Sequence, residues 1–195
     1  KILLVISALT LLFAFSWNTF FQLNFWKNGI TLFEHAVSVT ENNYPAHYYL
    51  GTAYEPINLD KAISYYKAAL KIKPGFALAL NNLGIIYSKK GQIDEAVNYY
   101  LKALQTKPDY LDALNNMGIA YVNNGNYDQA VLSFEKALKI DPQKTDARMN
   151  LANALYLQSK HDEAISQYRQ VLQTDPDNID ARYNLALVLY SQKKI

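Results

Sequence analysis

The sequence predicts an all-α solenoid, which is a stack of similar two-helix units. Residues of the same type recur at intervals of 34 along the chain. A fixed period of this length, with helical spacing inside each period, is typical of stacked helix pairs. Because one pair cannot bury its apolar face alone, neighbouring units are expected to stack. The recurring residues are Pro74, Pro108, Pro142 and Pro176, the alanines Ala62, Ala96, Ala130 and Ala164, and the aromatic residues Tyr66, Tyr100, Phe134 and Tyr168.

The stretch from 77 to 110 shows how the spacing predicts the two helices of one unit. Leu83 and Tyr87 lie four residues apart, on one face of a first helix. Gly91 follows as a stop, because glycine readily adopts the left-handed backbone that ends many helices. Asp94 opens the second helix, where an acidic side chain complements the helix dipole. Pro108 ends the unit, since the residue before a proline avoids helical geometry.

This stretch resembles the tetratricopeptide repeat (TPR). The residues that carry the resemblance are Leu80-x-x-Leu83-Gly84-x-x-Tyr87, then Ala96-x-x-x-Tyr100 and Pro108. The resemblance extends over about four repeats in a single frame. It implies a right-handed superhelix whose concave surface binds proteins or peptides. We expect the small residues Gly84 and Ala96 to face each other where the two helices cross.

The repeat frame divides the whole chain into segments. Two repeats depart from the pattern, because residues 55–58 replace the glycine turn in the first, and Ala152 and Ser159 take the glycine positions in the fourth. The last helix is apolar on a face that a terminal cap should keep polar, so we expect it to fray. The segments are a hydrophobic segment 1–24, a half-repeat 25–43 that resembles a second helix, four full repeats 44–76, 77–110, 111–144 and 145–178, and the first helix of a fifth repeat at 179–195.

The N-terminal segment predicts a transmembrane helix. Residues 2–26 carry no charge, and Trp17 and Trp26 follow the most apolar part as interfacial aromatic residues do. A span needs roughly 20 apolar residues, which residues 2–21 supply with a few polar interruptions. Two alternatives stay open: a signal peptide cleaved near residues 14–16, and a buried helix of a soluble domain. Lys1 and Lys27 flank the segment symmetrically, so the charges do not indicate its orientation.

Composition excludes several classes of function. The net charge is +2 and no basic stripe occurs, which argues against nucleic acid as the main partner. The absence of cysteine excludes disulfides and thiol chemistry. The chain begins with Lys1 rather than methionine, and we interpret it as a piece of a longer protein.

No catalytic or metal-binding pattern occurs in the sequence. His35, His47 and His161 lie in different units without cysteines nearby, so they do not form a metal-ligand spacing. No nucleophile elbow or glycine-rich phosphate loop is present. Acidic residues recur at the start of second helices, where a structural role is the ordinary one. We therefore expect a chain that is not itself an enzyme, with no cofactor, no metal and no evident small-molecule substrate.

A row of asparagines is the best candidate for a binding site. The row resembles the asparagine ladder of the O-GlcNAc transferase TPR superhelix, which grips the backbone of extended peptides. An amide side chain both donates and accepts hydrogen bonds, so it pairs with any peptide unit regardless of sequence. The alternative is that polar residues merely keep the concave surface hydrated. The row consists of Asn82, Asn116, Asn150 and Asn184, and Asn81 and Asn115 stand beside its first two members.

A second row, of aspartates, lies near the start of the first helices. Asp112, Asp146 and Asp180 could favour basic partners, and we include Asp112 and Asp146 in the predicted groove. They could equally complement helix dipoles, an effect of roughly 0.3–1 kcal/mol each. TPR domains that clamp the C-terminal carboxylate of a chaperone carry lysines at such positions. Leu78 and the aspartates stand there instead, which disfavours that specialised function.

The order of the segments resembles the C-terminal part of polytopic O-mannosyltransferases that end in TPRs. An apolar span is followed by residues 26–37 (WKNGITLFEHAV) and then by the first repeat. The resemblance implies a membrane location with the repeats on the extracytoplasmic or lumenal side, and it carries over no catalytic residue. Two hypotheses result: a membrane-anchored scaffold that binds a protein or peptide, and the substrate-engaging tail of a membrane glycosyltransferase.

Overall fold

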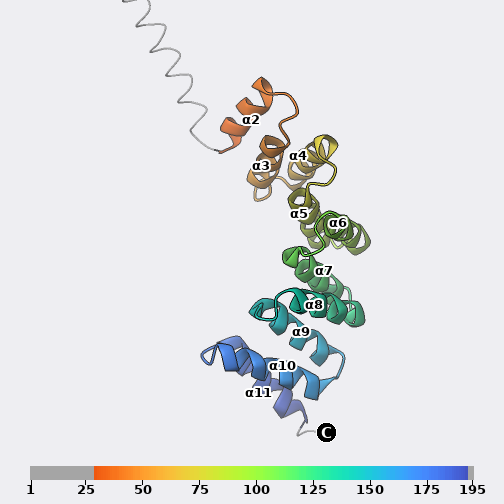
Figure 1. Ribbon diagram of the computed structural model, residues 1–195, viewed down its shortest axis with the longest axis vertical. Coiled ribbons are helices and arrows are strands. Elements are labelled where there is room, and N and C mark those ends of the chain that lie inside the picture. The colour runs from red at the N-terminus through yellow and green to blue at the C-terminus, as the bar shows by residue number, and fades with distance from the viewer. Residues whose placement is uncertain (1–28, 193–195) are drawn as a thin grey trace, which may run out of the picture. The chain divides into compact units, whose positions relative to one another are not determined.

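The computed structural model describes residues 29–192, and every regular element within that range is an α-helix (Figure 1). The helices are α2 (Gly29–Val39), α3 (Tyr44–Tyr54), α4 (Leu59–Ile72), α5 (Ala77–Lys89), α6 (Ile93–Thr106), α7 (Leu111–Asn123), α8 (Tyr127–Ile140), α9 (Thr145–Leu157), α10 (His161–Thr174) and α11 (Ile179–Gln192). Within each unit the helices pack as consecutive pairs, α3 with α4, then α5 with α6, α7 with α8 and α9 with α10, as expected for two-helix repeats.

The predicted membrane segment, residues 2–21, lies outside the described residues, as do the two alternatives for it. Within residues 29–192, none of the helices combines the length and the hydrophobicity that a bilayer span requires.

The chain divides into two compact units, Lys1–Pro74 and Gly75–Ile195. In the described part of the first unit, α2 lies against α3 through aromatic contacts. The rings of Phe33 and Tyr49 stack with centroids 4.9 Å apart, and the Tyr54 hydroxyl donates to a Glu34 carboxylate oxygen at 3.0 Å. The amide side chains of Asn43 and Asn58 cap the two following helices by accepting from backbone N–H groups.

In the second unit, the close approach of the helices within a pair depends on a glycine opposite an aromatic ring. A Cβ built on Gly84 would lie 2.5 Å from the Tyr100 ring, and one on Gly118 would lie 2.5 Å from the Phe134 ring. We expected Ala96 to face Gly84; the atoms nearest to a Cβ on Gly84 belong to the ring of Tyr100. The period of 34 therefore repeats a glycine–aromatic contact as well as a pattern of small residues.

The turns within the repeats end their first helices in the same way. Gly91 and Gly125 adopt φ values of 74° and 75°, and Ser159 adopts 62° at the corresponding point of the fourth repeat. In each case the N–H three residues beyond the last helical residue donates to a carbonyl in the last turn, for example Gln92 N to Tyr87 O at 3.0 Å. This is the hydrogen bond that closes a Schellman cap.

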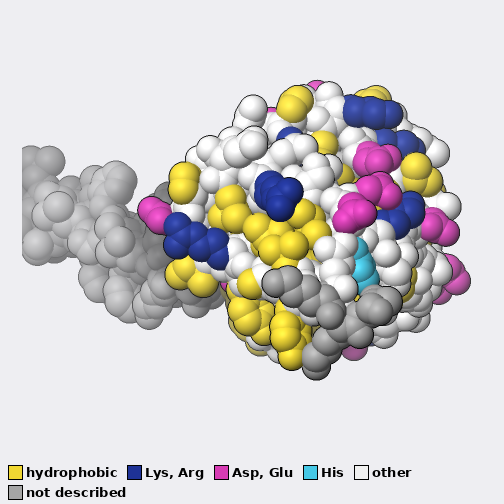
Figure 2. All heavy atoms as spheres, turned by 90° about the horizontal axis from the view of Figure 1, so that it is seen from below, with side chains coloured by type: hydrophobic (Ala, Val, Ile, Leu, Met, Phe, Trp, Pro, Cys, Tyr) yellow, Lys and Arg dark blue, Asp and Glu magenta, His cyan; other side chains and the backbone are white. Residues whose placement is uncertain are grey.

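The last helix of the described range, α11, presents a row of hydrophobic side chains to solvent. Ile179, Tyr183 and Tyr190 are 79%, 68% and 59% exposed. Figure 2, a view of the C-terminal end, shows hydrophobic side chains gathered on this face. One period earlier, Met149 and Tyr156 of α9 pack against the core that α10 helps to form.

Candidate binding groove on the first helices

A groove of about 560 Å³ runs across the first helices of the second unit. Side chains from α7, α9 and α11 line it, and nearly all of them are polar. Amide side chains predominate, and no lysine or arginine is among the residues that line it. The lining residues are Asn115, Thr145, Asp146, Met149, Asn150, Asn153, Asn178, Asp180 and Asn184.

Hydrogen bonds join the asparagines of consecutive repeats into a ladder. The Nδ2 group of Asn116 donates to Asn81 Oδ1 at 3.1 Å, and that of Asn150 donates to Asn115 Oδ1 at 3.0 Å. In both cases, the donor belongs to the predicted asparagine row. The acceptor lies 35 residues earlier in the chain, directly before the row member of the preceding repeat. These bonds hold the amides in one orientation along the face of the stack.

The ladder changes partner where the second asparagine of the pair is missing. Met149 stands at the position that corresponds to Asn115, and a thioether does not replace the amide as an acceptor. Asn184 Nδ2 instead donates to Asn153 Oδ1 at 3.2 Å, one helical turn further along α9. The hydroxyl of Tyr168 donates to the same Asn153 oxygen. A buried aromatic residue therefore holds the Asn153 side chain, the acceptor at this end of the ladder, in place.

The ladder leaves hydrogen-bonding capacity for a ligand. A side-chain amide has two N–H donors and one carbonyl oxygen with two lone pairs. Asn150 and Asn184 each donate one N–H to a neighbour, which leaves a second N–H and the Oδ1 acceptor. Both side chains are half-buried and line the groove. A peptide unit, with one donor and one acceptor of its own, is chemically complementary to such a group.

Acidic side chains set the electrostatic character of the groove. Asp146 and Asp180 are exposed and line it. Because no basic residue stands among the lining groups, the groove favours neutral or basic ligands over acidic ones. The nearby Arg182 side chain does not line the groove; it forms an ion pair at 3.0 Å with Asp177, which precedes α11 in the sequence.

The structure brings together some of the predicted site residues and separates others. Asn115, Asn150, Asn184 and Asp146 line the same groove. Asn82 and Asn116 are half-buried and Asp112 is exposed, and these three lie on α5 and α7 outside that groove. Asn81 is only 4% exposed, so it positions Asn116 rather than facing solvent.

Five lining residues were not included in the predicted groove: Thr145, Met149, Asn153, Asn178 and Asp180. A signal existed for Asn153, which follows Asn150 by three residues and therefore shares its helical face. Asn178 caps α11 by accepting from Ala181 N at 2.9 Å, a role that an asparagine before a helix also indicates.

Two of the three histidines, His47 and His161, pack against aromatic rings. His47 faces Tyr65, and burial lowers the pKa of its imidazole. His161 lies against the ring of Tyr156, with centroids 5.6 Å apart. Within residues 29–192, no group of three histidine, cysteine, aspartate or glutamate side chains could hold a metal ion.

The paired helices, their glycine–aromatic contacts and the polar groove define a helical-repeat scaffold. Sequence profiles described as tetratricopeptide repeat match residues 45–76, 75–143, 115–179 and 158–195. The chain therefore belongs to the tetratricopeptide repeat family from residue 45 to residue 195.

Two curated relatives are similar over part of the chain. Protein O-mannosyl-transferase TMTC1 of Homo sapiens is 37% identical over 84 residues, which are 43% of this chain and 10% of the relative. The protein of the same name from Mus musculus is also 37% identical over 84 residues and 9% of its length. The matched region thus spans about a tenth of these relatives.

Solved TPR structures share the fold. MamA has a TM-score of 0.69 at 24% identity, with 75% of this chain and 86% of that chain covered. YrrB, described as a TPR protein with an unusual peptide-binding site, has a TM-score of 0.69 at 24% identity and covers 83% of this chain and 84% of its own. The first TPR of Spaghetti (RPAP3), bound to the HSP90 peptide SRMEEVD, has a TM-score of 0.57 at 26% identity. The match covers 60% of this chain and 93% of that chain.

Proposed function

We propose that the chain is an interaction scaffold that binds an extended peptide segment of a protein along the groove lined by Asn115, Asn150 and Asn184. One observation carries the proposal: these amides line a groove of about 560 Å³, and hydrogen bonds between repeats already fix them. Fixing the amides beforehand reduces the conformational entropy lost on binding. Since each amide offers a donor and an acceptor, it can pair with a peptide backbone of any sequence.

The structural neighbours support a peptide as the class of ligand. RPAP3 is described with an HSP90 peptide, and YrrB with a peptide-binding site. Our groove carries Asp146 and Asp180, so its ligand should be neutral or basic. We retain the repeat boundaries 44–76, 77–110, 111–144 and 145–178 as part of the proposal, with the half-repeat 25–43 before them and the first helix of a fifth repeat after them.

We further propose that residues 2–21 anchor this scaffold to a membrane, with the repeats on the extracytoplasmic or lumenal side. The uncharged stretch of residues 2–26 supports the anchor. A second candidate function is the substrate-engaging tail of a membrane glycosyltransferase. The 37% identity to a protein named as an O-mannosyl-transferase favours it.

Substitution of Asn150 by alanine tests the groove. We expect binding of labelled neutral and basic nonapeptides to weaken roughly fivefold, since one hydrogen bond contributes about 1 kcal/mol. Fluorescence anisotropy measures the change. Asn98→Ala is the matched control, because Asn98 is exposed on α6 and does not line the groove.

Peptides methylated on alternate backbone nitrogens separate backbone recognition from side-chain recognition. They should bind more weakly than the unmodified peptides if the amides grip the backbone. Equal affinity of Asn150→Ala and the unaltered protein would remove this groove as the binding site. Peptides rich in serine and threonine that bind at least tenfold more tightly than the others would favour the glycosyltransferase tail, whose substrates must present hydroxyl groups.

A further inference from the structure

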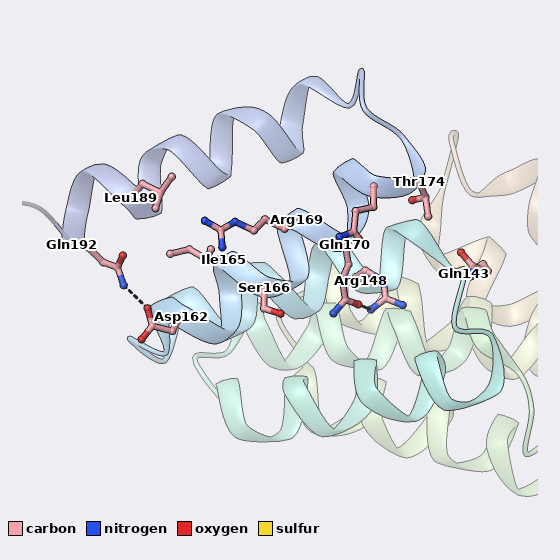
Figure 3. Close-up of a pocket in the computed structure, with 11 residues that line it drawn as sticks. Gln143, Arg148, Asp162, Ile165, Ser166, Arg169, Gln170, Thr174, Leu189 and Gln192 are labelled. Atoms are coloured by element: carbon pink, nitrogen blue, oxygen red, sulfur yellow. Dashed lines mark hydrogen bonds between the residues drawn. The ribbon is translucent and has the colours of Figure 1, made fainter.

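A second groove lies along α10, between the start of α9 and the end of α11, with a volume of about 740 Å³ (Figure 3). It shares no lining residue with the groove lined by Asn115, Asn150 and Asn184, which we call the asparagine groove. Its walls contain Arg148 and Arg169 together with several glutamine side chains. We call it the arginine groove.

Arg148 occupies a position that the second and third repeats give to the hydrophobic core. One and two periods earlier stand Leu114 and Leu80, each only 3% exposed. In the fourth repeat, the guanidinium group is half-buried and donates to Gln167 Oε1 at 3.0 Å, to Gln170 Oε1 and to the Pro142 carbonyl. Figure 3 shows Arg148 and Gln170 side by side. All three acceptors are neutral.

Arg148 keeps N–H donors available for a further acceptor. A guanidinium group has five N–H donors, and only three are used by these contacts. A partly buried cation normally has a carboxylate partner, because removal from water penalises an isolated charge. Within residues 29–192, neither Arg148 nor Arg169 forms an ion pair with a carboxylate.

Arg169 adds a second positive charge to the same groove. Its exposed side chain extends from α10 into the space that these residues line (Figure 3). The carboxylate that lines the groove, Asp162, lies near the start of α10 and accepts from Gln192 Nε2 at 2.8 Å. The groove therefore carries two positive charges, from Arg148 of α9 and Arg169 of α10, and one negative charge, from Asp162 at the start of α10.

Neither of the two positions holds a cation in the second and third repeats. The positions that correspond to Arg148 and Arg169 in the third repeat hold Leu114 and Glu135, and in the second repeat Leu80 and Leu101. Packing of the repeats therefore does not require a cation at either position. Arg182 stands at the position of Arg148 in the fifth repeat and Lys67 at that of Arg169 in the first, and the fourth is the one full repeat with arginine at both positions.

We propose that the arginine groove binds an acidic peptide segment, whose carboxylates pair with Arg148 and Arg169. The lining of α10 from Asp162 to Thr174 extends about 18 Å at 1.5 Å per residue, enough for five or so extended residues. Glutamine amides along this length offer donors and acceptors to a peptide backbone. Guanidinium groups pair with carboxylates through two parallel hydrogen bonds. The two grooves of the molecule thus select peptides of opposite charge.

Arg148→Leu is the sharpest test, because it restores the residue found in the preceding repeats and should leave the fold intact. The probe is a fluorescein-labelled nonapeptide with glutamate at alternate positions, titrated by anisotropy at low salt. We expect at least tenfold weaker binding for Arg148→Leu and for Arg169→Gln, with unchanged urea midpoints. Binding to the unaltered protein should weaken as salt rises, because a charge-paired contact at a surface is screened.

Two variants serve as controls, and several outcomes would overturn the proposal. Arg182→Gln removes an exposed arginine that pairs with Asp177 outside the groove, and Asn150→Ala alters the other groove, so both should bind the acidic peptide normally. Equal binding of a peptide with glutamine in place of glutamate would refute the carboxylate contact, as would undiminished binding by Arg148→Leu. Inorganic phosphate or a phosphorylated peptide binding tenfold more tightly would replace the acidic peptide with a phosphate ligand. Because Asn150→Ala reports on the first groove alone, failure of either proposal leaves the other intact.

Discussion

The aromatic side chain on each second helix determines how closely the two helices of a repeat approach. Tyr66, Tyr100, Phe134 and Tyr168 are each 1% exposed or less. Burying such a ring removes a large apolar surface from water, and a buried tyrosine also needs a partner for its hydroxyl. Tyr66 donates to Glu55, and Tyr168 donates to Asn153 in the ladder. Tyr168 therefore connects the hydrophobic core to the groove that Asn153 lines.

The raised pKa of the Tyr168 phenol predicts that the protein loses stability at alkaline pH. Burial, with a smaller contribution from Tyr156, raises the pKa of Tyr168 from 10.0 to about 12. The folded state thus favours the neutral phenol, so this stabilisation is complete below pH 10 and is lost as the pH rises through 12. The full effect is roughly 2 kcal/mol.

Urea unfolding at several pH values measures this effect by comparison with Tyr168→Phe, which lacks the ionisable group. Between pH 9 and pH 11 the unaltered protein should lose about 1 kcal/mol more than the variant. Other groups titrate identically in both proteins, so parallel losses would contradict the prediction.

In the second, third and fourth repeats, the turn between the two helices determines where the first helix ends. Gly91, Gly125 and Ser159 all have positive φ, and all three turns close with the same hydrogen bond. Glycine adopts this backbone without a steric penalty, whereas a serine side chain brings its Cβ close to the backbone. The fourth repeat keeps the turn geometry because its hydrogen bonds and its helices require it.

Ser159→Gly should therefore stabilise the protein by about 1 kcal/mol, since it removes the left-handed strain at this one residue. Ser166→Gly is the control, because Ser166 lies within α10, where glycine should cost about 0.5 kcal/mol. Urea denaturation midpoints report both changes. A lower midpoint for Ser159→Gly than for the unaltered protein would mean that the serine side chain supports the turn.

At the scale of the whole molecule, stability in a repeat protein is close to a sum over units and the interfaces between neighbours. Within the second unit, α7 and α8 have a neighbouring repeat on both sides, whereas α11 packs chiefly on α10 in the described range. The exposure of Ile179, Tyr183 and Tyr190 reflects this difference. Local opening should therefore cost least at α11.

Amide hydrogen exchange tests this gradient. Residues 185–190 of α11 should exchange more than tenfold faster than the interior residues of α7, because fewer buried contacts must break for the helix to open. Mass spectrometry on proteolytic fragments resolves the two helices. Equal protection would show that α11 opens only when the whole unit unfolds.

The helices, their turns and the presence of a polar row were predictable because they depend on residues close together in the sequence. The glycine–aromatic contact was only half predictable: the period showed that Gly84 and Tyr100 recur together, and it did not show that they touch. The partners of the asparagines were not predictable, because they depend on the axial offset between repeats. That offset puts Asn150 beside Asn115 and, where Met149 interrupts the pattern, Asn184 beside Asn153.

The sequence by itself determined that this chain is a helical-repeat protein with an asparagine in each repeat from the second onward, since a 34-residue period records the local spacing of every helix and turn. Only the tertiary structure decided which amides line one groove, which of them support the others from within, and that Arg148, at a position held by core leucines in the second and third repeats, joins Arg169 in a second groove. The physical reason is that hydrogen bonds and grooves between repeats depend on how neighbouring helices stack, and stacking is a property of the packed unit that no single repeat specifies.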